Sequence, residues 1–307
     1  MIPTFSHFSI PLPSVRLPTP SMRTSSLVII GILPVAAPTA YLLYLRLTTI
    51  RHITSSTGRY HPIPTIDKSS SRPQSPSPSP SSPSSSFSSD PPPLPVTIPA
   101  HLPTSPSHII MYERITSHPI PLTSLHLSDR SSASPSDNVH ALLTTYLRTT
   151  MKAFSRTPQA YIIRSALRGN PAGATFDDSC IDALEFVPGD RVNGVYVVTY
   201  RGEGHHDGAG LAGLGERVEM KLETPVGYAG PGKEVEGMII AGIEGVRGGV
   251  GKQEGQREVG DILLVNETWF WRGEKGKPVM LESLVGRWLH GLLAGWLVVK
   301  GMKAITV

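Results

Sequence analysis

Acidic residues are missing from the first part of the chain, and cysteine is nearly missing from all of it. No Asp or Glu occurs before Asp67, so the formal net charge of +4 comes largely from N-terminal arginines. Such an excess is typical of membrane-flanking charge, whereas nucleic-acid binding needs a clustered basic face, and we predict no nucleic-acid partner. The single cysteine, Cys180, excludes an intrachain disulfide and a zinc site built from several cysteines.

An uncharged apolar run follows this acid-free N-terminus, over residues 27–45. At 1.5 Å rise per residue, a helix over this range would span about 28 Å, close to the hydrocarbon thickness of a bilayer. A cleaved signal peptide and a buried apolar segment are the alternatives, and the run is long for a signal peptide. Pro34 and Pro38 are expected to kink the helix. We predict a single transmembrane helix within residues 26–47, preceded by a tail over residues 1–25.

The basic residues that flank the apolar run predict its orientation. More Lys and Arg follow the run than precede it, which favours a cytosolic C-terminal domain. The tail contains Ser, Thr and Arg without an acid, as transit peptides do, so the mitochondrial inner membrane is the alternative location. The prolines of the tail argue against that alternative, because they would break an amphipathic helix.

Ser and Pro make up almost all of residues 69–93. Such a composition cannot bury enough apolar surface to offset the entropy lost on ordering. We therefore predict a disordered linker over residues 48–107 and a folded domain over residues 108–307.

The pattern of apolar residues predicts an α+β domain. A strand begins at His108, and two helices follow, one capped by Ser136 or Asp137 and one that starts at Thr157-Pro158. Segments with strand character then alternate with Gly- or Pro-rich breaks. They lie at residues 181–187, 192–201, 217–224, 236–244 and 261–271.

The last predicted element is a helix over residues 280–300, where apolar residues recur at helical spacing. Its uncharged stretch is too short to cross a membrane, so we predict a buried amphipathic helix. Peripheral membrane contact through Trp288 and Trp296 is the alternative.

This order of strand, helices, antiparallel meander and long C-terminal helix resembles the helix-grip arrangement of START-like lipid-transfer and polyketide cyclase-like domains. The resemblance covers about residues 108–300 and rests on the order of elements and on the apolar final helix. It implies a curved antiparallel sheet around the last helix, with a hydrophobic ligand between them. An NTF2-like cone is the alternative, but such a cone usually ends in a strand.

Glycine-rich segments match parts of nucleotide-binding motifs but lack their context. Residues 208–213 match GxGxxG, yet a strand-like segment follows where a dinucleotide site needs a helix. Gly251-Lys252 lacks the first glycine and the Ser or Thr of a P-loop. His205-His206-Asp207 could bind a metal or exchange protons, but adjacent histidines on an extended chain point to opposite sides. We therefore predict no cofactor and no metal.

The segment 261–271 carries the main candidate for chemistry. Glu267, Trp269 and Trp271 share one face of this predicted strand, because alternate residues point the same way. A carboxylate between two tryptophans could be a buried acid at the wall of an apolar pocket. Alternatively, this face points outward, with Glu267 solvated and both rings packed under the linker or on the membrane. His290 on the final helix is the second candidate acid–base residue.

Three functions fit these features. The first is a membrane-tethered module that binds a hydrophobic small molecule or a membrane lipid. Its expected lining residues are aromatic: Tyr196, Tyr228, Trp269, Trp271 and Trp288. The second is a cyclase, isomerase or hydrolase on the same scaffold, with Glu267 or His290 as the acid–base group. The third is an assembly or scaffold protein that meets a membrane partner.

Overall fold

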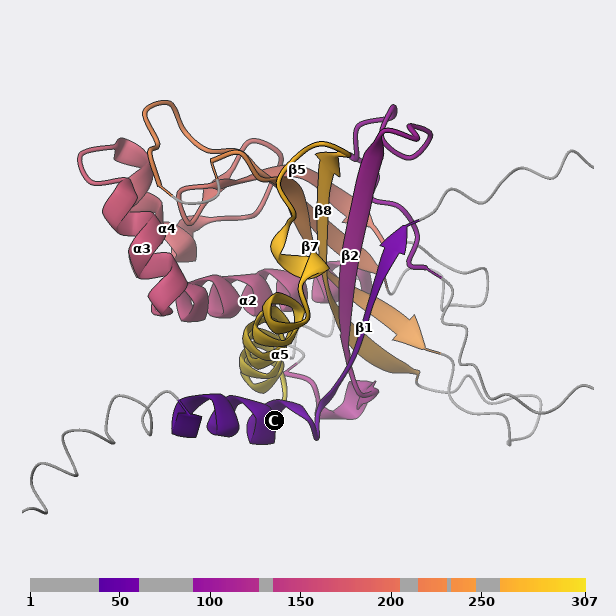
Figure 1. The fold of residues 1–307 in the computed structure, drawn as a ribbon. Helices are drawn as coiled ribbons and strands as arrows, with labels where there is room; N and C mark the ends of the chain where they lie inside the picture. The colour runs from indigo at the N-terminus through magenta and orange to yellow at the C-terminus, as the bar shows by residue number, and fades with distance from the viewer. Residues whose placement is uncertain (1–38, 61–90, 127–134, 205–214, 231–232, 247–259) are drawn as a thin grey trace, which may run out of the picture. The chain divides into compact units, whose positions relative to one another are not determined.

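An antiparallel sheet organises the computed structural model (Figure 1). The structure describes residues 39–60, 91–126, 135–204, 215–230, 233–246 and 260–307. The chain divides into two units, Met1–Tyr44 and Leu45–Val307. Of the first unit only residues 39–44 are described, and they are helical. The sheet and the helices that pack on it belong to the second unit.

The sheet of the described residues has eight strands in the order β1-β2-β8-β7-β6-β5-β4, with β3 paired to β8. The strands are β1 (Ile53–Tyr60), β2 (His108–Ser117), β3 (Ile120–Pro121), β4 (Arg191–Val192), β5 (Tyr196–Glu203), β6 (Glu216–Leu222), β7 (Glu236–Val246) and β8 (Asp261–Gly273). The helices are η1 (Leu122–Ser124), α2 (Pro135–Ser155), α3 (Pro158–Ala166), η2 (Pro171–Phe176), α4 (Asp178–Ala183), η3 (Met280–Glu282) and α5 (Leu284–Ile305). The α+β class, the antiparallel sheet and its packing on a C-terminal helix are therefore confirmed.

The two faces of the sheet have different covers, because successive side chains of a strand point to opposite faces. On β8, Ile262 and Leu264 join the cluster formed with α2 and α5, which defines the helix face. Trp269 and Trp271 belong to a different cluster on the opposite side, which we call the back face. The long β7–β8 pairing, from Glu236↔Trp271 to Val246↔Asp261, keeps this alternation in register across the sheet centre.

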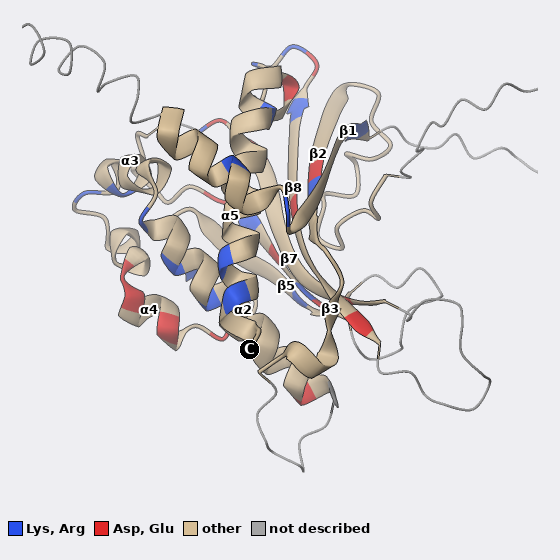
Figure 2. Ribbon diagram, turned by 90° about the horizontal axis from the view of Figure 1, so that it is seen from below, with Lys and Arg blue, Asp and Glu red and all other residues tan. Residues whose placement is uncertain are grey.

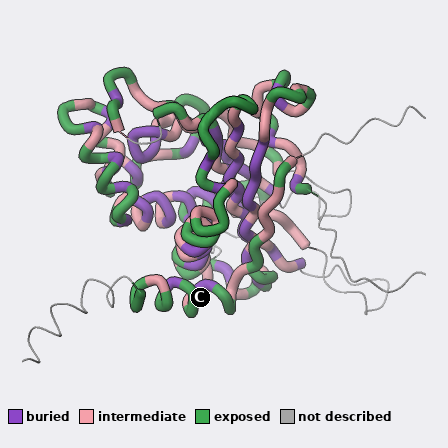
Figure 3. Tube along the Cα trace, viewed as in Figure 1, coloured by how far each residue is buried: buried purple, intermediate pink, exposed green. Residues whose placement is uncertain are grey.

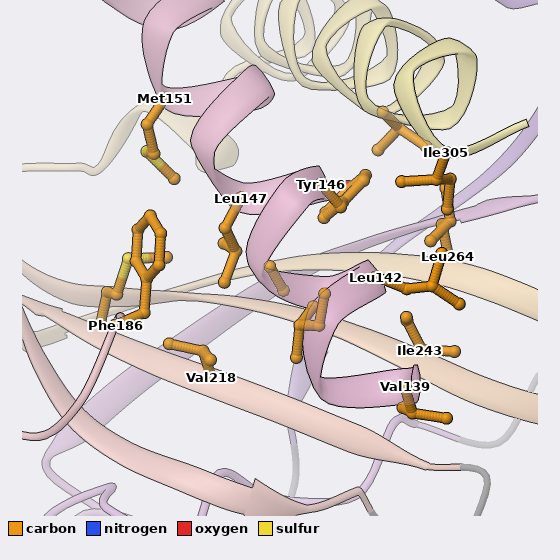
Figure 4. Close-up of a cluster of buried hydrophobic side chains, with 14 of the residues drawn as sticks. Val139, Leu142, Tyr146, Leu147, Met151, Phe186, Val218, Ile243, Leu264 and Ile305 are labelled. Carbon is orange, nitrogen blue, oxygen red and sulfur yellow. The ribbon is translucent and has the colours of Figure 1, made fainter. Parts of the chain in front are cut away.

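The main core lies between α2 and the helix face (Figure 4). One side of α2 presents apolar residues at helical spacing, and Leu143 and Leu147 are fully buried. Each such leucine contributes roughly 1.5–3 kcal/mol of transfer free energy. Figure 4 shows α2 side chains above Val218, Ile243 and Leu264 of the sheet. This packing holds the sheet in place. The remaining helices enclose a cavity against the same face of the sheet.

The predicted strand over residues 181–187 is wrong, because Asp178–Ala183 forms the helix α4. Ile181 and Leu184 lie one helical turn apart and both pack on the main core. Acidic residues of α4 pair with basic residues at the end of α2 and just after it: Asp182 pairs with Lys152 of α2, and Asp178 pairs with Arg156, the residue that follows α2 (Figure 2). These tertiary contacts favour a helix over the strand that local composition indicated.

The structure differs from the predicted linker over residues 48–107 at both of its ends. Ile53–Tyr60 is the edge strand β1, which pairs with β2 from Ile53↔Ser117 to Tyr60↔Ile110. Residues 91–107 cover the back face, where Leu102 is buried and Leu94 and Ile98 pack on the cluster that contains the two tryptophans. Pairing with β2 and the packing of a few apolar residues, rather than overall composition, decide the structure here. The Ser/Pro stretch over residues 61–90 lies outside the described residues.

The predicted helices after His108 are confirmed with small shifts of their ends. Thr157 caps α3, accepting a 3.2 Å hydrogen bond from the Ala160 N–H, and Pro158 is its first residue. The predicted helix 280–300 is split, because Ser283 ends η3 and caps α5 by accepting from the Gly286 N–H. Most of the predicted transmembrane run 27–45 lies outside the described residues. Within those residues, no helix has the length and apolar character needed to cross a membrane.

Candidate functional site

A cavity of about 460 Å³ lies on the helix face, between α3, the sheet and the start of α5. Its lining is mostly apolar and comes from α3, from β5 to β8 and their connections, and from η3 and α5. The lining residues are Gln159, Ile162, Ile163, Val195, Tyr196, Leu222, Thr224, Tyr228, Val235, Met238, Ile239, Thr268, Phe270, Met280 and His290. The cavity reaches the surface beside Ile162, which is 53% exposed.

The position of α3 creates the space. The Thr157 cap and Pro158 restart the chain as a new helix after α2, so α3 departs from the main core. Its buried residues Ala160 and Ile163 join a second apolar cluster with Tyr228. This second cluster closes one side of the cavity.

Two tyrosines give the cavity uncharged hydroxyl groups. Burial raises the pKa of Tyr196 to about 12, with a smaller contribution from Tyr228. Burial also raises the pKa of Tyr228. Both phenols therefore stay protonated at neutral pH and add no charge to the apolar wall.

A histidine–glutamate pair supplies the ionisable group of the cavity. The Nδ1 atom of His290 on α5 is hydrogen-bonded to the Glu113 Oε2 atom on β2. Glu113 is buried, and Gly291 allows the close approach, since a Cβ atom there would lie 3.0 Å from Glu113 Oε1. Phe270 packs against the imidazole with ring centroids 6.4 Å apart. The carboxylate and the ring contact together fix the orientation of His290.

This pair defines what the cavity can do chemically. A carboxylate that accepts from Nδ1–H leaves Nε2 as the ring nitrogen that can accept a hydrogen bond or a proton. Thr268, which also lines the cavity, lies opposite Glu113 in the β2–β8 register. The wall can therefore hold the polar end of an otherwise apolar ligand.

The structure brings together three of the residues singled out from the sequence. Tyr196, Tyr228 and His290 line the cavity. Trp269 and Trp271 do not, because the alternation of β8 places them on the back face with Tyr60 and Tyr112. They pack under the 91–107 segment, as one of the two alternatives for this face expected, but Glu267 on the same face is buried rather than solvated.

Glu267 is likewise on the back face, away from His290. It pairs with Arg114 and accepts a 2.9 Å hydrogen bond from Trp269 Nε1, while Arg114 also binds Glu244 at 2.7 Å. Burial raises the pKa of Glu267, and Arg114 opposes that shift. Because its oxygens are occupied by these partners, Glu267 acts as a structural ion-pair residue rather than an acid in the cavity.

Trp288 lies outside the cavity and is 45% exposed, on the side of α5 that borders a second hollow. Sequence reasoning missed Glu113 and Thr268. Strand alternation over residues 261–271 puts Thr268 on the same face as Phe270, and this is the sequence signal that could have found Thr268. Nothing in the sequence connects Glu113 with His290, which is 177 residues away.

Metal and cofactor candidates from the sequence fall mostly outside the described residues. These are the GxGxxG match at 208–213, the His205-His206-Asp207 run and Gly251-Lys252. Cys180 lies on α4 and is half-buried. In the part of the chain that the structure describes, no three His, Cys, Asp or Glu side chains are grouped as metal ligands.

Comparison with known proteins adds no further assignment. No family model, curated protein or solved structure matches this chain.

Proposed function

We propose that this chain binds a hydrophobic small molecule or lipid in the cavity of the helix face. The observation that carries the proposal is the cavity itself, about 460 Å³ and mostly apolar. Small-molecule sites typically measure roughly 300–1,000 Å³ and combine apolar walls with a few polar groups. His290, held by Glu113, is the group that would fix the polar end of the ligand.

The arrangement of the elements supports the same function. In the helix-grip arrangement a hydrophobic ligand lies between an antiparallel sheet and the last helix. Here the cavity has Ile239 and Phe270 of the sheet on one side and His290 of α5 on another. A helix-grip relationship is therefore part of the proposal.

A membrane location completes the proposal. The uncharged run 27–45 would anchor the chain, with the C-terminal unit in the cytosol or, alternatively, on the matrix side of the mitochondrial inner membrane. A membrane-resident ligand is consistent with that location.

Titration with the uncharged fluorophore N-phenyl-1-naphthylamine tests the binding function. The full-length chain is expected to enhance its fluorescence with a saturable, one-site curve. Ile162→Trp narrows the cavity and should weaken binding at least tenfold. Tyr161→Trp is the matched control, because Tyr161 is the preceding residue of α3, is 71% exposed and does not line the cavity. Equal binding by both variants, or no saturable binding by the unaltered chain, would contradict the proposal.

The His290–Glu113 pair favours a second candidate function, that of an acid–base enzyme on an apolar substrate. A histidine oriented by a buried carboxylate is a common general base. Hydrolysis of p-nitrophenyl hexanoate by the full-length chain tests it. His290→Gln should abolish turnover but leave N-phenyl-1-naphthylamine binding within twofold, whereas unchanged turnover in that variant would remove this candidate.

A further inference from the structure

A second hollow lies outside the cavity, on the surface formed by residues 46–57 and the first turns of α5. Its volume is about 530 Å³. Arg46, Ile53, Arg287, Trp288 and Glu113 are among its lining residues. We call it the arginine groove, after Arg46 and Arg287.

The two arginines of the groove have no counter-charge among the described residues. Neither Arg46 nor Arg287 makes an ion pair there, whereas Arg114, Arg201 and Arg272 each bind a carboxylate. The one acidic residue among the described lining is Glu113, which is buried and bonded to His290. The groove thus offers two guanidinium groups to an external anion, and guanidinium forks match phosphate geometry.

Apolar side chains surround these charges and face solvent. On α5, Leu284 is 77% and Val285 67% exposed, whereas Val298 and Val299 further along the same helix are buried. In Figure 3 exposed and buried residues both occur along this helix. Leu47 and Ile50 are also more than half exposed. The start of α5 is therefore apolar, and none of the described residues covers it.

This combination identifies the partner chemically. Exposed leucines, a half-exposed tryptophan and adjacent arginines are the features of surfaces that lie in the membrane interface. Arginines near such a surface are attracted to anionic headgroups. The groove also begins at Arg46, directly after the uncharged run 27–45. A soluble anion would be matched by the arginines but would leave the apolar residues uncovered.

We propose that the arginine groove binds the phosphate-bearing headgroup of an anionic phospholipid, with Leu284, Val285 and Trp288 seated in the bilayer surface. The inference rests on the proposed membrane location but not on the cavity ligand. Glu113 lines the groove while its partner His290 lines the cavity, so the docked surface and the proposed ligand site share one side-chain pair.

A fluorophore at position 285 tests the docking. The full-length chain carries Cys180→Ser and Val285→Cys, labelled with an environment-sensitive nitrobenzoxadiazole group, and is mixed with vesicles of phosphatidylcholine with or without phosphatidylserine. We expect a blue shift with phosphatidylserine and little shift without it. Arg46→Gln/Arg287→Gln should lose the shift. Arg168→Gln/Lys303→Gln, which removes equal charge away from the groove, should keep it; Lys303 lies about 24 Å along α5 from Arg287.

The outcomes separate the groove from the anchor. Flotation with phosphatidylcholine vesicles reports the anchor, so a chain that floats but never shifts retains its membrane location and refutes the groove. An equal loss of the blue shift in both double variants would show a general electrostatic attraction to the vesicle and would also refute binding in the groove. Glycerophosphoserine, the headgroup without acyl chains, should give no blue shift; a shift would mean that the groove takes a free phosphodiester and would overturn bilayer docking.

Discussion

The helix face and the back face of the sheet are buried in different ways, and the difference separates the candidate site from the scaffold. Helices cover one face and leave a cavity of about 460 Å³ between them. The segment 91–107, which has neither helix nor strand and contains several turns, covers the other face and packs on the cluster that contains Trp269 and Trp271. Helices that depart from one another leave space between them, whereas the irregular segment 91–107 packs closely on the surface that it covers.

Neighbouring residues of β2 show the same contrast for charge. Glu113 points to the helix face and holds His290 at the cavity wall. Arg114 points to the back face and joins Glu244 and Glu267. The Glu113–His290 pair leaves a ring nitrogen of His290 for a ligand. In the second group, Arg114 occupies both carboxylates within the fold. Burial alone therefore does not identify a functional carboxylate; the face that it occupies does.

The largest expected effect comes from truncating Trp269, which is compared with truncating its neighbour on β8, Phe270. Trp269→Ala should lower the free energy of unfolding by about 3–5 kcal/mol, because it empties a fully buried site on the back face. The variant that remains folded should bind N-phenyl-1-naphthylamine as before. Phe270→Ala, on the cavity side, should cost less stability and weaken the probe more. Urea denaturation measures the loss of stability in each variant, and probe titration measures its binding. Weakened probe binding in Trp269→Ala but not in Phe270→Ala would contradict the assignment of the cavity to the helix face.

The next effect concerns the ion pair of the back face. Arg114→Gln should cost about 3–5 kcal/mol near neutral pH, because it leaves Glu267 buried without its counter-charge. Glu267→Gln should cost less, since Arg114 keeps Glu244 at 2.7 Å. Urea denaturation of the two variants gives the comparison, and equal losses would contradict it.

The same pair predicts a pH dependence. Burial raises the folded-state pKa of Glu267 above its ordinary value of 4.5, and Arg114 holds that pKa down. A carboxyl with a raised folded-state pKa stabilises the fold below the unfolded-state pKa, and this contribution is lost as pH rises through the folded-state pKa. The deficit of Arg114→Gln should therefore grow from acidic to neutral pH. A deficit that is constant with pH would show that lost packing, not charge, is responsible.

Strand alternation could be predicted from the sequence, but the cover of each face could not. The shared face of Glu267, Trp269 and Trp271 followed from the period of two and is confirmed. Which side it faced depended on residues 91–107, whose prolines were typical of a linker. Tyr196 and Tyr228 reach the same cavity only because β5 and the loop after β6 meet α3. Such contacts between segments far apart in the sequence leave no local signal in the residues that make them.

The smallest effect tests how the 91–107 segment is held. The Val96 and Thr97 N–H groups donate to the Glu219 carboxylate at 2.7 and 2.8 Å, and the Thr97 hydroxyl adds a third bond at 2.7 Å. Thr97→Val removes that third bond and also the 2.8 Å bond between the Thr97 and Thr199 hydroxyls, so the loss should be about 1–3 kcal/mol.

Hydrogen exchange locates this loss. Amides of residues 94–102 should exchange faster in Thr97→Val, while probe binding in the cavity stays unchanged, because the opened contact lies on the back face. Thr104→Val is the control, since the Thr104 hydroxyl makes only an exposed 3.4 Å bond to the His101 carbonyl. If both variants accelerate exchange alike, Glu219 does not hold the segment, and the cover of the back face depends on its apolar contacts with Trp269 and Trp271 alone.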